Sequence, residues 1–82
     1  MKTRVKVGDL VIRRSFNDFY IYPIKSRTDR TIETALDKHG RLREYRFVSD
    51  RAKAQKIKDI EKQIRTLSKE AANLYNSFPE IE

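Results

Sequence analysis

The sequence predicts an α+β fold, in which a small antiparallel half-barrel of four to five strands is followed by one long C-terminal amphipathic helix. Residues 3–48 contain short runs of β-branched and aromatic residues separated by turn signals. Residues 50–77 contain neither glycine nor proline, and their apolar residues recur every three or four positions. The chain of 82 residues has no cysteine, so neither a disulfide framework nor a zinc cluster can reinforce its one domain.

The first two expected strands lie in residues 3–14 and 19–25. The earlier segment alternates and then becomes apolar, with a turn or bulge signal at residues 8–9 between the two parts. The later segment is aromatic and β-branched, as strands prefer. Because Pro23 has no amide hydrogen to donate, we expect an edge strand, a bulge or a strand end there.

The clearest turn signal is the segment 37–40, whose glycine is available for a positive φ. Residues 31–36 precede it and residues 42–48 follow it, and we expect these segments to pair as a hairpin. In the returning strand Tyr45 and Phe47 fall on one face, and charged residues fall on the other. Short strands at this spacing are typical of a meander curled into a half-barrel.

The expected helix begins at Ser49 or Asp50, since either side chain can accept a hydrogen bond from an unpaired amide of the first turn. Pro79 ends it. Its apolar residues follow at alternating spacings of three and four, as in a heptad repeat. This apolar seam consists of Ile57, Ile60, Ile64, Leu67, Ala71, Leu74 and Phe78. The chain thus divides into a basic β-rich head, residues 1–48, and a helix with a short tail, residues 49–82, within a single structural domain.

The predicted helix is longer than the head that it follows. About 28 residues of helix extend for about 42 Å, whereas a compact head of about 48 residues is roughly 25 Å across. A straight helix would leave Leu67, Leu74 and Phe78 uncovered, and each would forfeit about 1.5–3 kcal/mol of burial. We expect a second copy to cover them, forming a homodimer through the C-terminal helix. A partner protein, or a break near Ser68 that folds the helix back on itself, are the alternatives.

The basic residues are concentrated in the head. The formal net charge is +7; residues 1–48 hold twelve Lys/Arg against six Asp/Glu, and residues 49–82 hold seven against six. Eight of the twelve are arginine, which suits bidentate contact with phosphate or carboxylate. Basic side chains interleaved with tyrosines are typical of nucleic-acid surfaces. The residues expected to bind nucleic acid or an acidic partner are Arg13, Arg14, Tyr20, Tyr22, Lys25, Arg27, Arg30, Arg41, Arg43 and Arg46.

Two arrangements of residues 19–22 remain open. In one, Phe19 and Ile21 form the core and the opposite face of the strand is solvated. In the other, Tyr20 and Tyr22 themselves belong to the core. Either arrangement would explain the two tyrosines without a binding role, so their part in binding stays a prediction.

The first predicted strand carries a phrase found in a known class of small barrels. Val5 precedes Gly8 by three residues, and Asp9 and Val11 follow, giving the pattern V-x-x-G-D-x-V. This phrase resembles the opening strand of SH3-like barrels of the KOW type. The resemblance implies an SH3-like half-barrel over residues 4–48.

The same resemblance implies a binding role. In such barrels the loops between early strands commonly contact RNA, DNA or a polymerase, which would single out Arg13, Arg14 and the loop of residues 15–18. The sequence departs from the pattern, because the glycine expected later in a KOW strand is missing and the long helix is an addition. A tiny basic barrel with a helical tail also resembles, in type, many phage-encoded accessory proteins.

The sequence offers no set of residues suited to catalysis. His39 is the single histidine and lies in a predicted turn, and with no second histidine or cysteine it makes a poor metal site. Gly8 and Gly40 are isolated and form no phosphate-cradling loop. Four carboxylates in predicted connections are interpreted as turn formers rather than Mg²⁺ ligands, namely Asp9, Asp18, Asp29 and Asp37. We therefore expect no enzyme activity, no metal and no cofactor.

The expected function is that of a small accessory protein that binds nucleic acid or a nucleoprotein complex through its arginine-rich head. The rival expectation is a modulator or inhibitor of a host enzyme that handles nucleic acid, docking by its basic face or by the apolar seam. The sequence contains no apolar run of roughly 18 residues and begins with a charged segment. We therefore expect a soluble cytoplasmic protein with no membrane contact.

Overall fold

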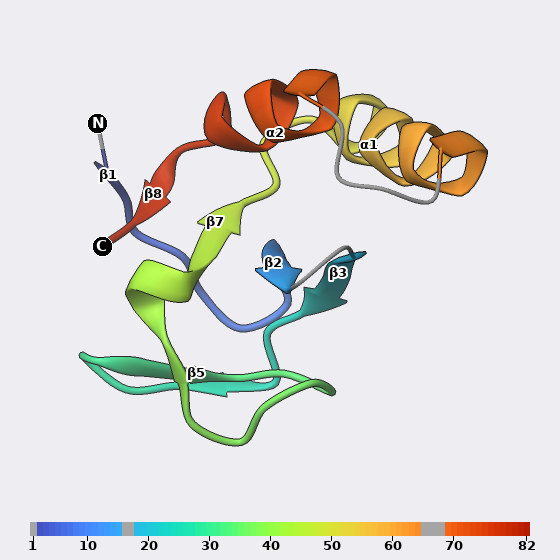
Figure 1. Cartoon of the computed structure of the whole chain (residues 1–82). Coiled ribbons are helices and arrows are strands. Elements are labelled where there is room, and N and C mark those ends of the chain that lie inside the picture. Colours follow the sequence, from blue (N-terminus) through green and yellow to red (C-terminus); the bar gives the residue numbers. More distant parts are fainter. Residues whose placement is uncertain (1, 16–17, 65–68) are drawn as a thin grey trace.

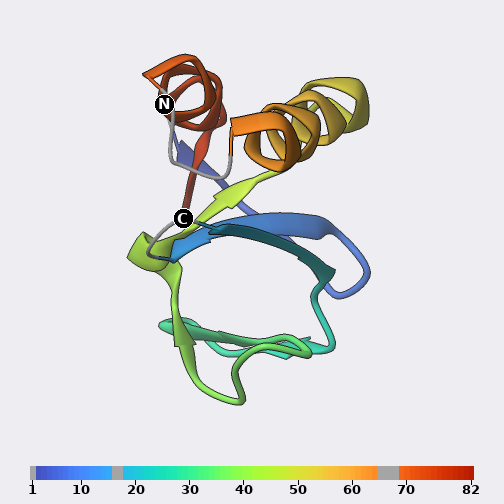
Figure 2. The same ribbon diagram turned by 45° about the vertical axis from the view of Figure 1, so that its right-hand side comes forward.

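The computed structural model describes residues 2–15, 18–64 and 69–82, with the side chains of residues 61–64 excepted. Its elements form three layers (Figure 1). Two helices cover one face of a five-stranded sheet, and a three-stranded sheet lies on the other side, as Figure 2 shows. The described chain is therefore a small α+β fold in which one sheet separates two apolar interiors.

The five-stranded sheet forms the middle layer. Its strands are, in spatial order, β1 (Lys2–Thr3), β8 (Glu80–Ile81), β7 (Tyr45–Phe47), β2 (Leu10–Ser15) and β3 (Asp18–Pro23). β1 and β8 run parallel, and the other neighbours are antiparallel. β3 is an edge strand that ends at Pro23, which confirms the expectation drawn from that proline.

The smaller sheet interrupts the predicted hairpin. It consists of β4 (Ser26–Arg27), β5 (Thr31–Glu33) and β6 (Gly40–Arg41), all antiparallel. A 3₁₀ turn, η1 (Leu42–Glu44), follows β6, and the chain then crosses to the middle sheet, where β7 pairs with β2 and β8. The expected pairing of residues 42–48 with residues 31–36 is therefore wrong.

The single half-barrel of four to five strands is wrong for the same reason. The described strands are divided between a mixed five-stranded sheet and a three-stranded sheet. β1, β4, β6 and β8 contain two residues each, and two residues are too few to show the alternation by which a strand is recognised in sequence. The middle sheet also needs β8, which lies beyond the helices in the chain and next to β1 in space.

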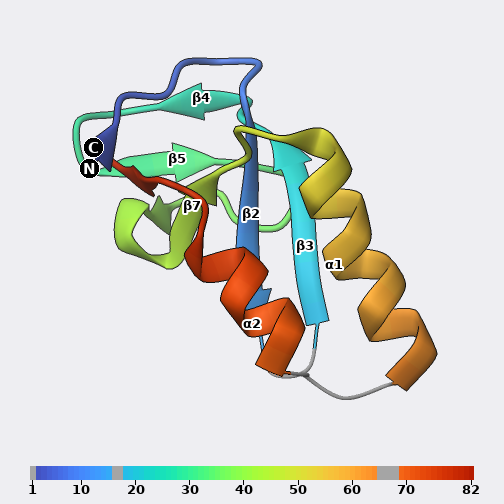
Figure 3. The same cartoon turned by 90° about the horizontal axis from the view of Figure 1, so that it is seen from above.

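The single long helix is wrong as well. α1 (Arg51–Ile64) and α2 (Lys69–Asn76) are separate helices. They lie side by side over the middle sheet and run in opposite directions (Figure 3). The 14 residues of α1 extend for about 21 Å, close to the roughly 20 Å of the six-residue strands beneath it. A helix that returns over the same sheet buries apolar residues that a straight continuation would leave in water.

The start of α1 agrees with the sequence. Asp50 Oδ1 accepts hydrogen bonds from the backbone amides of Ala52 (2.9 Å) and Lys53 (3.2 Å). Asp50 is therefore the N-cap, one of the two residues predicted for that role. After α2, Pro79 precedes β8, and its carbonyl accepts a hydrogen bond from the amide of Phe47 (3.0 Å).

The middle sheet separates two apolar clusters, because successive side chains of a strand point to opposite faces. In β2, Ile12 faces the helices and Val11 faces the smaller sheet; both are fully buried. The helix-side cluster contains Ile12, Phe19, Val48, Ala54, Ile57, Ile60, Ala71, Tyr75 and Phe78. The cluster between the sheets contains Val5, Val11, Ile24, Ile32, Tyr45 and Ile81, with Phe47 packed against it. Tyr45 and Phe47 thus share a face, as the alternation of that strand predicts.

The sequence predicts a positive φ for the glycine of the turn at residues 37–40, but the structure has the positive φ at the other glycine, Gly8. Gly8 has the positive φ (94°), in a turn closed by a hydrogen bond from the Asp9 amide to the Lys6 carbonyl (3.0 Å). Gly40 is required for another reason: an ideal Cβ there would lie 2.6 Å from Cε2 of Tyr45. Packing of the tyrosine ring against the backbone, and not a left-handed conformation, selects glycine at position 40.

Replacing Gly40 with alanine should lower the free energy of unfolding by about 1–3 kcal/mol, because the added methyl overlaps a buried ring. Chemical denaturation measures the change. The control is a double-mutant cycle in which Gly40→Ala is repeated in a Tyr45→Leu background. The cost should fall there because the ring is absent; an equal cost in both backgrounds would contradict the explanation.

Candidate nucleic-acid interface

Arg13 is engaged inside the protein. Its guanidinium donates to Asp37 Oδ2, lies 3.5 Å from Glu44 Oε2, and is 5.9 Å from the centre of the Tyr45 ring. The hydroxyl of Tyr45 donates to the same Asp37 oxygen (3.1 Å) and lies 3.3 Å from Oγ1 of Thr34. Burial is the main cause that raises the pKa of Tyr45. These contacts tie the loop between β5 and β6 to the middle sheet.

Arg27 is also engaged internally. It donates to the carbonyl of Val5 (2.6 Å), to the main-chain oxygen of Glu82 (2.8 Å) and to the carbonyl of Thr28 (3.2 Å). The side chain therefore connects β4 to the segments that flank β1 and β8. Its donors already have acceptors within the fold, so its charge is poorly placed to meet an external phosphate.

Arg46 connects the helical layer to the middle sheet. It donates to the carbonyls of Asn76 (3.1 Å) and Phe78 (2.8 Å), which follow from the end of α2. Its guanidinium lies 5.3 Å from the centre of the Tyr75 ring and 3.8 Å from Glu80 Oε1. Burial raises the pKa of Tyr75, and the positive charge of Arg46 opposes that effect.

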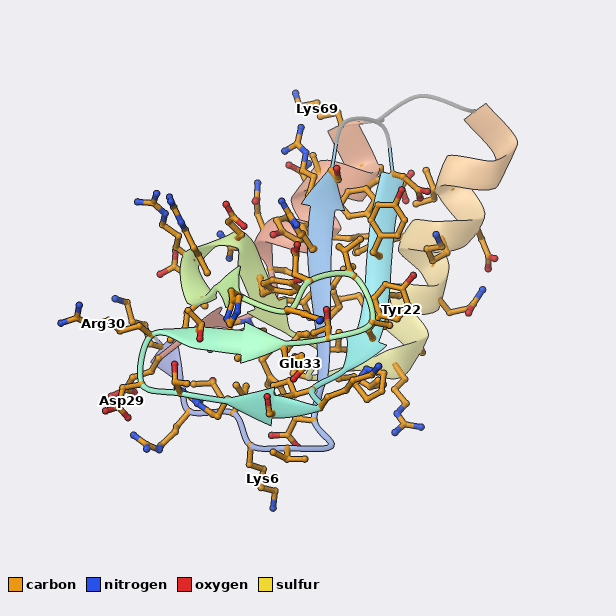
Figure 4. All side chains as sticks on the ribbon, turned by 90° about the horizontal axis from the view of Figure 1, so that it is seen from below. Lys6, Tyr22, Asp29, Arg30, Glu33 and Lys69 are labelled. Atoms are coloured by element: carbon orange, nitrogen blue, oxygen red, sulfur yellow. The ribbon has the colours of Figure 1, made fainter. Side chains whose placement is uncertain are left out.

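Arg30, Arg41 and Arg43 differ from these three. All are exposed, and no other residue in the described part of the chain forms a hydrogen bond or an ion pair with their side chains. Arg41 in β6 is the Cα partner of Thr31 in β5. Arg30 directly precedes Thr31 in the chain, and Arg43 lies two residues after Arg41, in η1. We call these three residues the arginine end of the smaller sheet. Figure 4 shows Arg30 at the tip of the β4–β5 turn, with Asp29 beside it.

Arg14 and Lys25 lie elsewhere. Arg14 is exposed and belongs to the helix-facing side of β2, since its neighbour Arg13 faces the smaller sheet. Lys25 is exposed and follows β3, where its amide donates to the carbonyl of Glu33 (2.8 Å). The adjacent arginines 13 and 14 therefore do not share a surface.

Tyr20 and Tyr22 are partly exposed and lie on one face of β3. Their rings are nearly parallel, with centroids 6.4 Å apart and an angle of 8° between the planes. Phe19 and Ile21, on the opposite face of the strand, pack into the helix-side cluster. Of the two arrangements that the sequence allows, the structure has the one in which Phe19 and Ile21 are core. We call Tyr20 and Tyr22 the tyrosine pair.

The predicted binding residues therefore do not form one surface: three are internal, three form the arginine end, two form the tyrosine pair, and Arg14 and Lys25 lie apart from these sets. Figure 4 shows Arg30 and Tyr22 well apart, with Glu33 of β5 between them. Sequence reasoning omitted Lys38 and His39, which are exposed and directly follow the anchored Asp37. No local pattern distinguishes them, because their position depends on the Arg13–Asp37 contact, which joins residues 24 positions apart.

The apolar seam lies inside the protein wherever its side chains are described. Ile57, Ile60, Ala71 and Phe78 are buried in the helix-side cluster, and Leu74 packs against it. The side chain of Ile64 and all of Leu67 lie outside the described residues. The fold-back alternative thus accounts for the seam in the described residues, and a homodimer is not needed to cover them.

No protein family, curated protein or solved structure matches the chain. The resemblance to KOW-type barrels therefore stays a prediction. Within the described ranges, no helix is both long enough and apolar enough to cross a membrane. The same residues contain no group of three or more histidine, cysteine or acidic side chains placed to hold a metal ion.

Proposed function

We propose that the protein is a non-enzymatic accessory protein that binds the phosphate backbone of nucleic acid, alone or in a nucleoprotein complex, through the arginine end. The observation that carries the proposal is the exposure of Arg30, Arg41 and Arg43, whose backbone positions the Thr31–Arg41 pairing brings near one another and which have no carboxylate partner among the described residues. Three neighbouring like charges repel one another, so folding alone does not favour them. A polyanion relieves this repulsion and releases its own counterions.

The contrast between arginines that are bound within the fold and arginines that are not supports the proposal. Arg13, Arg27 and Arg46 bind carboxylates or carbonyls within the fold, so arginine at those positions has a structural explanation. The arginine end has no such explanation. The net charge of +7 would further raise the rate of encounter with an anionic partner. In this proposal the protein acts in the cytoplasm and needs no cofactor.

The test is a fluorescence-anisotropy titration of labelled duplex DNA, single-stranded DNA and RNA at about 50 and 200 mM salt. The triple substitution Arg30→Ala, Arg41→Ala and Arg43→Ala should weaken binding at low salt by at least ten-fold. It should also reduce the slope of log K against log salt by roughly 0.7–0.9 for each phosphate that the variant no longer neutralises. The expected effect is similar for all sequences, because phosphate contacts carry no base information.

A matched control removes the same charge from the helical layer. This control variant carries three substitutions at exposed positions on α1 and α2, namely Arg51→Ala, Lys56→Ala and Lys69→Ala. This variant should keep more of the affinity and of the salt slope than the arginine-end variant. Equal reductions in the two variants would show that only net charge matters and would contradict an interface at the arginine end.

The rival function is that of a protein-binding modulator, which was expected to dock either by its basic face or by the apolar seam. Of these two modes, the structure favours only the basic face. Docking through the apolar seam required an uncovered helix face, and the described residues of the seam are buried in the helix-side cluster or, for Leu74, partly buried against it. Docking of an acidic protein on the basic face is the alternative outcome of the same titration. Absence of nucleic-acid binding even at low salt would overturn the proposed function and favour that alternative.

A further inference from the structure

We infer that the nucleic acid is single-stranded and that its bases stack on the tyrosine pair. This inference rests on the proposed function and names the class of nucleic acid. Tyr20 and Tyr22 are two parallel rings on the edge strand of the middle sheet, and both are partly exposed. Unpaired bases stack on such rings with little sequence preference, whereas bases in a duplex are already stacked on one another.

The tyrosine pair is not needed for the core. The described cluster between the two sheets is built from other residues of neighbouring elements, including Val11 and Tyr45, and the helix-side cluster takes Phe19 from β3. Neither tyrosine belongs to either cluster. Among the described residues, no hydrogen bond involves either tyrosine hydroxyl. Both rings therefore keep exposed surface that a partner can contact.

An exposed lysine comes near each end of the tyrosine pair. Arg13, the Cα partner of Tyr20, is bound to Asp37 and so holds the β5–β6 loop at that end, and exposed Lys38 directly follows Asp37. At the other end, Lys25 comes three residues after Tyr22 and is exposed. A short strand with two stacked bases would thus find a cation on either side for its phosphates.

The same strand can reach the arginine end. The longest dimension of the molecule is 36 Å. A strand of about ten nucleotides covers that length at a stacked rise of about 3.4 Å each. The direct path follows β5 past Glu33, whose carboxylate accepts a hydrogen bond from the Ser26 hydroxyl (3.0 Å). Glu33 is therefore a fixed negative charge on this path, and its removal should favour a strand that passes over it.

The test measures binding of the 82-residue chain to a deoxythymidine oligonucleotide of about ten residues and to a short duplex. Tyr20→Ala and Tyr22→Ala should each weaken single-strand binding about ten-fold, within the range measured for base–aromatic stacking, and change duplex binding less than two-fold. Tyr20→Phe and Tyr22→Phe keep the ring and should bind within two-fold of the unmodified protein. Glu33→Gln should strengthen single-strand binding by up to about five-fold.

Intrinsic fluorescence gives a second readout. The chain has no tryptophan and four tyrosines, of which Tyr45 and Tyr75 are buried. Bases stacked on the tyrosine pair should quench the emission, and the quench should disappear in the Tyr20→Ala, Tyr22→Ala double variant. A thermal melt of each variant verifies that the fold is intact.

Two results would overturn the inference without touching the proposed function. One is single-strand affinity unchanged by both alanine substitutions; the other is an equal reduction in the alanine and phenylalanine variants. In either case a salt-dependent effect of the arginine-end substitutions would still support phosphate binding. Preference for duplex over single strand would also overturn the inference. Failure of every nucleic acid to bind would overturn both proposals together.

Discussion

Ile57→Asp should unfold the whole protein at room temperature. The Ile57 side chain is completely buried between α1 and the middle sheet. Removal of the isoleucine costs about 2–5 kcal/mol, and an unpaired buried carboxylate adds several more. A chain of 82 residues has a total stability of about 4–12 kcal/mol. Circular dichroism should therefore show that strand and helix signals disappear together.

The same substitution distinguishes a core from an interface between copies. If residues 57–78 covered a second copy, Ile57→Asp would leave the head folded and only reduce the size in solution. The matched control is Ala52→Asp, which places the same charge on an exposed position in the first turn of α1. Its stability should stay within about 0.5 kcal/mol of the unmodified protein, since a carboxylate is favourable near a helix N-terminus.

Arg46→Met should cost about 3 kcal/mol, the second largest effect that we expect. Methionine keeps the apolar stem but removes the charge-assisted hydrogen bonds to the carbonyls of Asn76 and Phe78. Each such bond contributes about 1.5–3 kcal/mol, and partial exposure of the guanidinium lowers the total. Urea denaturation measures the change in stability. Arg51→Met, at an exposed position, should change stability by less than about 0.5 kcal/mol.

Hydrogen exchange tests whether the destabilisation in Arg46→Met begins where the hydrogen bonds of Arg46 are. The amide of Phe47 donates to the carbonyl of Pro79, directly after the segment that Arg46 holds. That amide should exchange faster in the variant, whereas amides of the β2–β3 ladder should keep the protection set by global unfolding. A uniform acceleration in all strands would contradict a local tie between α2 and β7.

The sequence predicts those features of the fold that depend on neighbouring residues. The Asp50 cap needs only amides two and three residues further along, and the placement of Pro23 follows from its missing amide hydrogen. The α+β class also follows from local periodicity. These signals act over a few residues, so one sequence is enough to detect them.

The features that were wrongly predicted depend on distant segments. Heptad spacing describes which residues of a helix are apolar, but the same spacing suits a coiled coil and a helical hairpin over a sheet. The choice depends on the length of β2 and β3, about 20 Å, which the helix itself does not encode. Two-residue strands such as β8 exist because of their partners and have no periodicity of their own.

The candidate site also combines features that neighbouring residues determine with features that distant segments determine. Composition identifies the cations, and it indicates that arginine is preferred in residues 1–48. It does not indicate which of them bind within the fold: Arg13 meets a carboxylate 24 residues away, and Arg46 meets carbonyls 30 and 32 residues away. Only the arrangement of the strands separates Arg13, Arg27 and Arg46 from the arginine end.

The parallel pairing of β1 with β8 has a consequence for synthesis. Thr3 pairs with Ile81, so the partners of this ladder are the earliest and latest parts of the described chain to be made. At roughly 5–20 residues per second, about 4–16 s separate the two on the ribosome. During that delay Val5 and Val11 have no Ile81 to pack against. The segment around β1 and the cluster between the sheets should therefore gain their full protection only once β8 is available to pair.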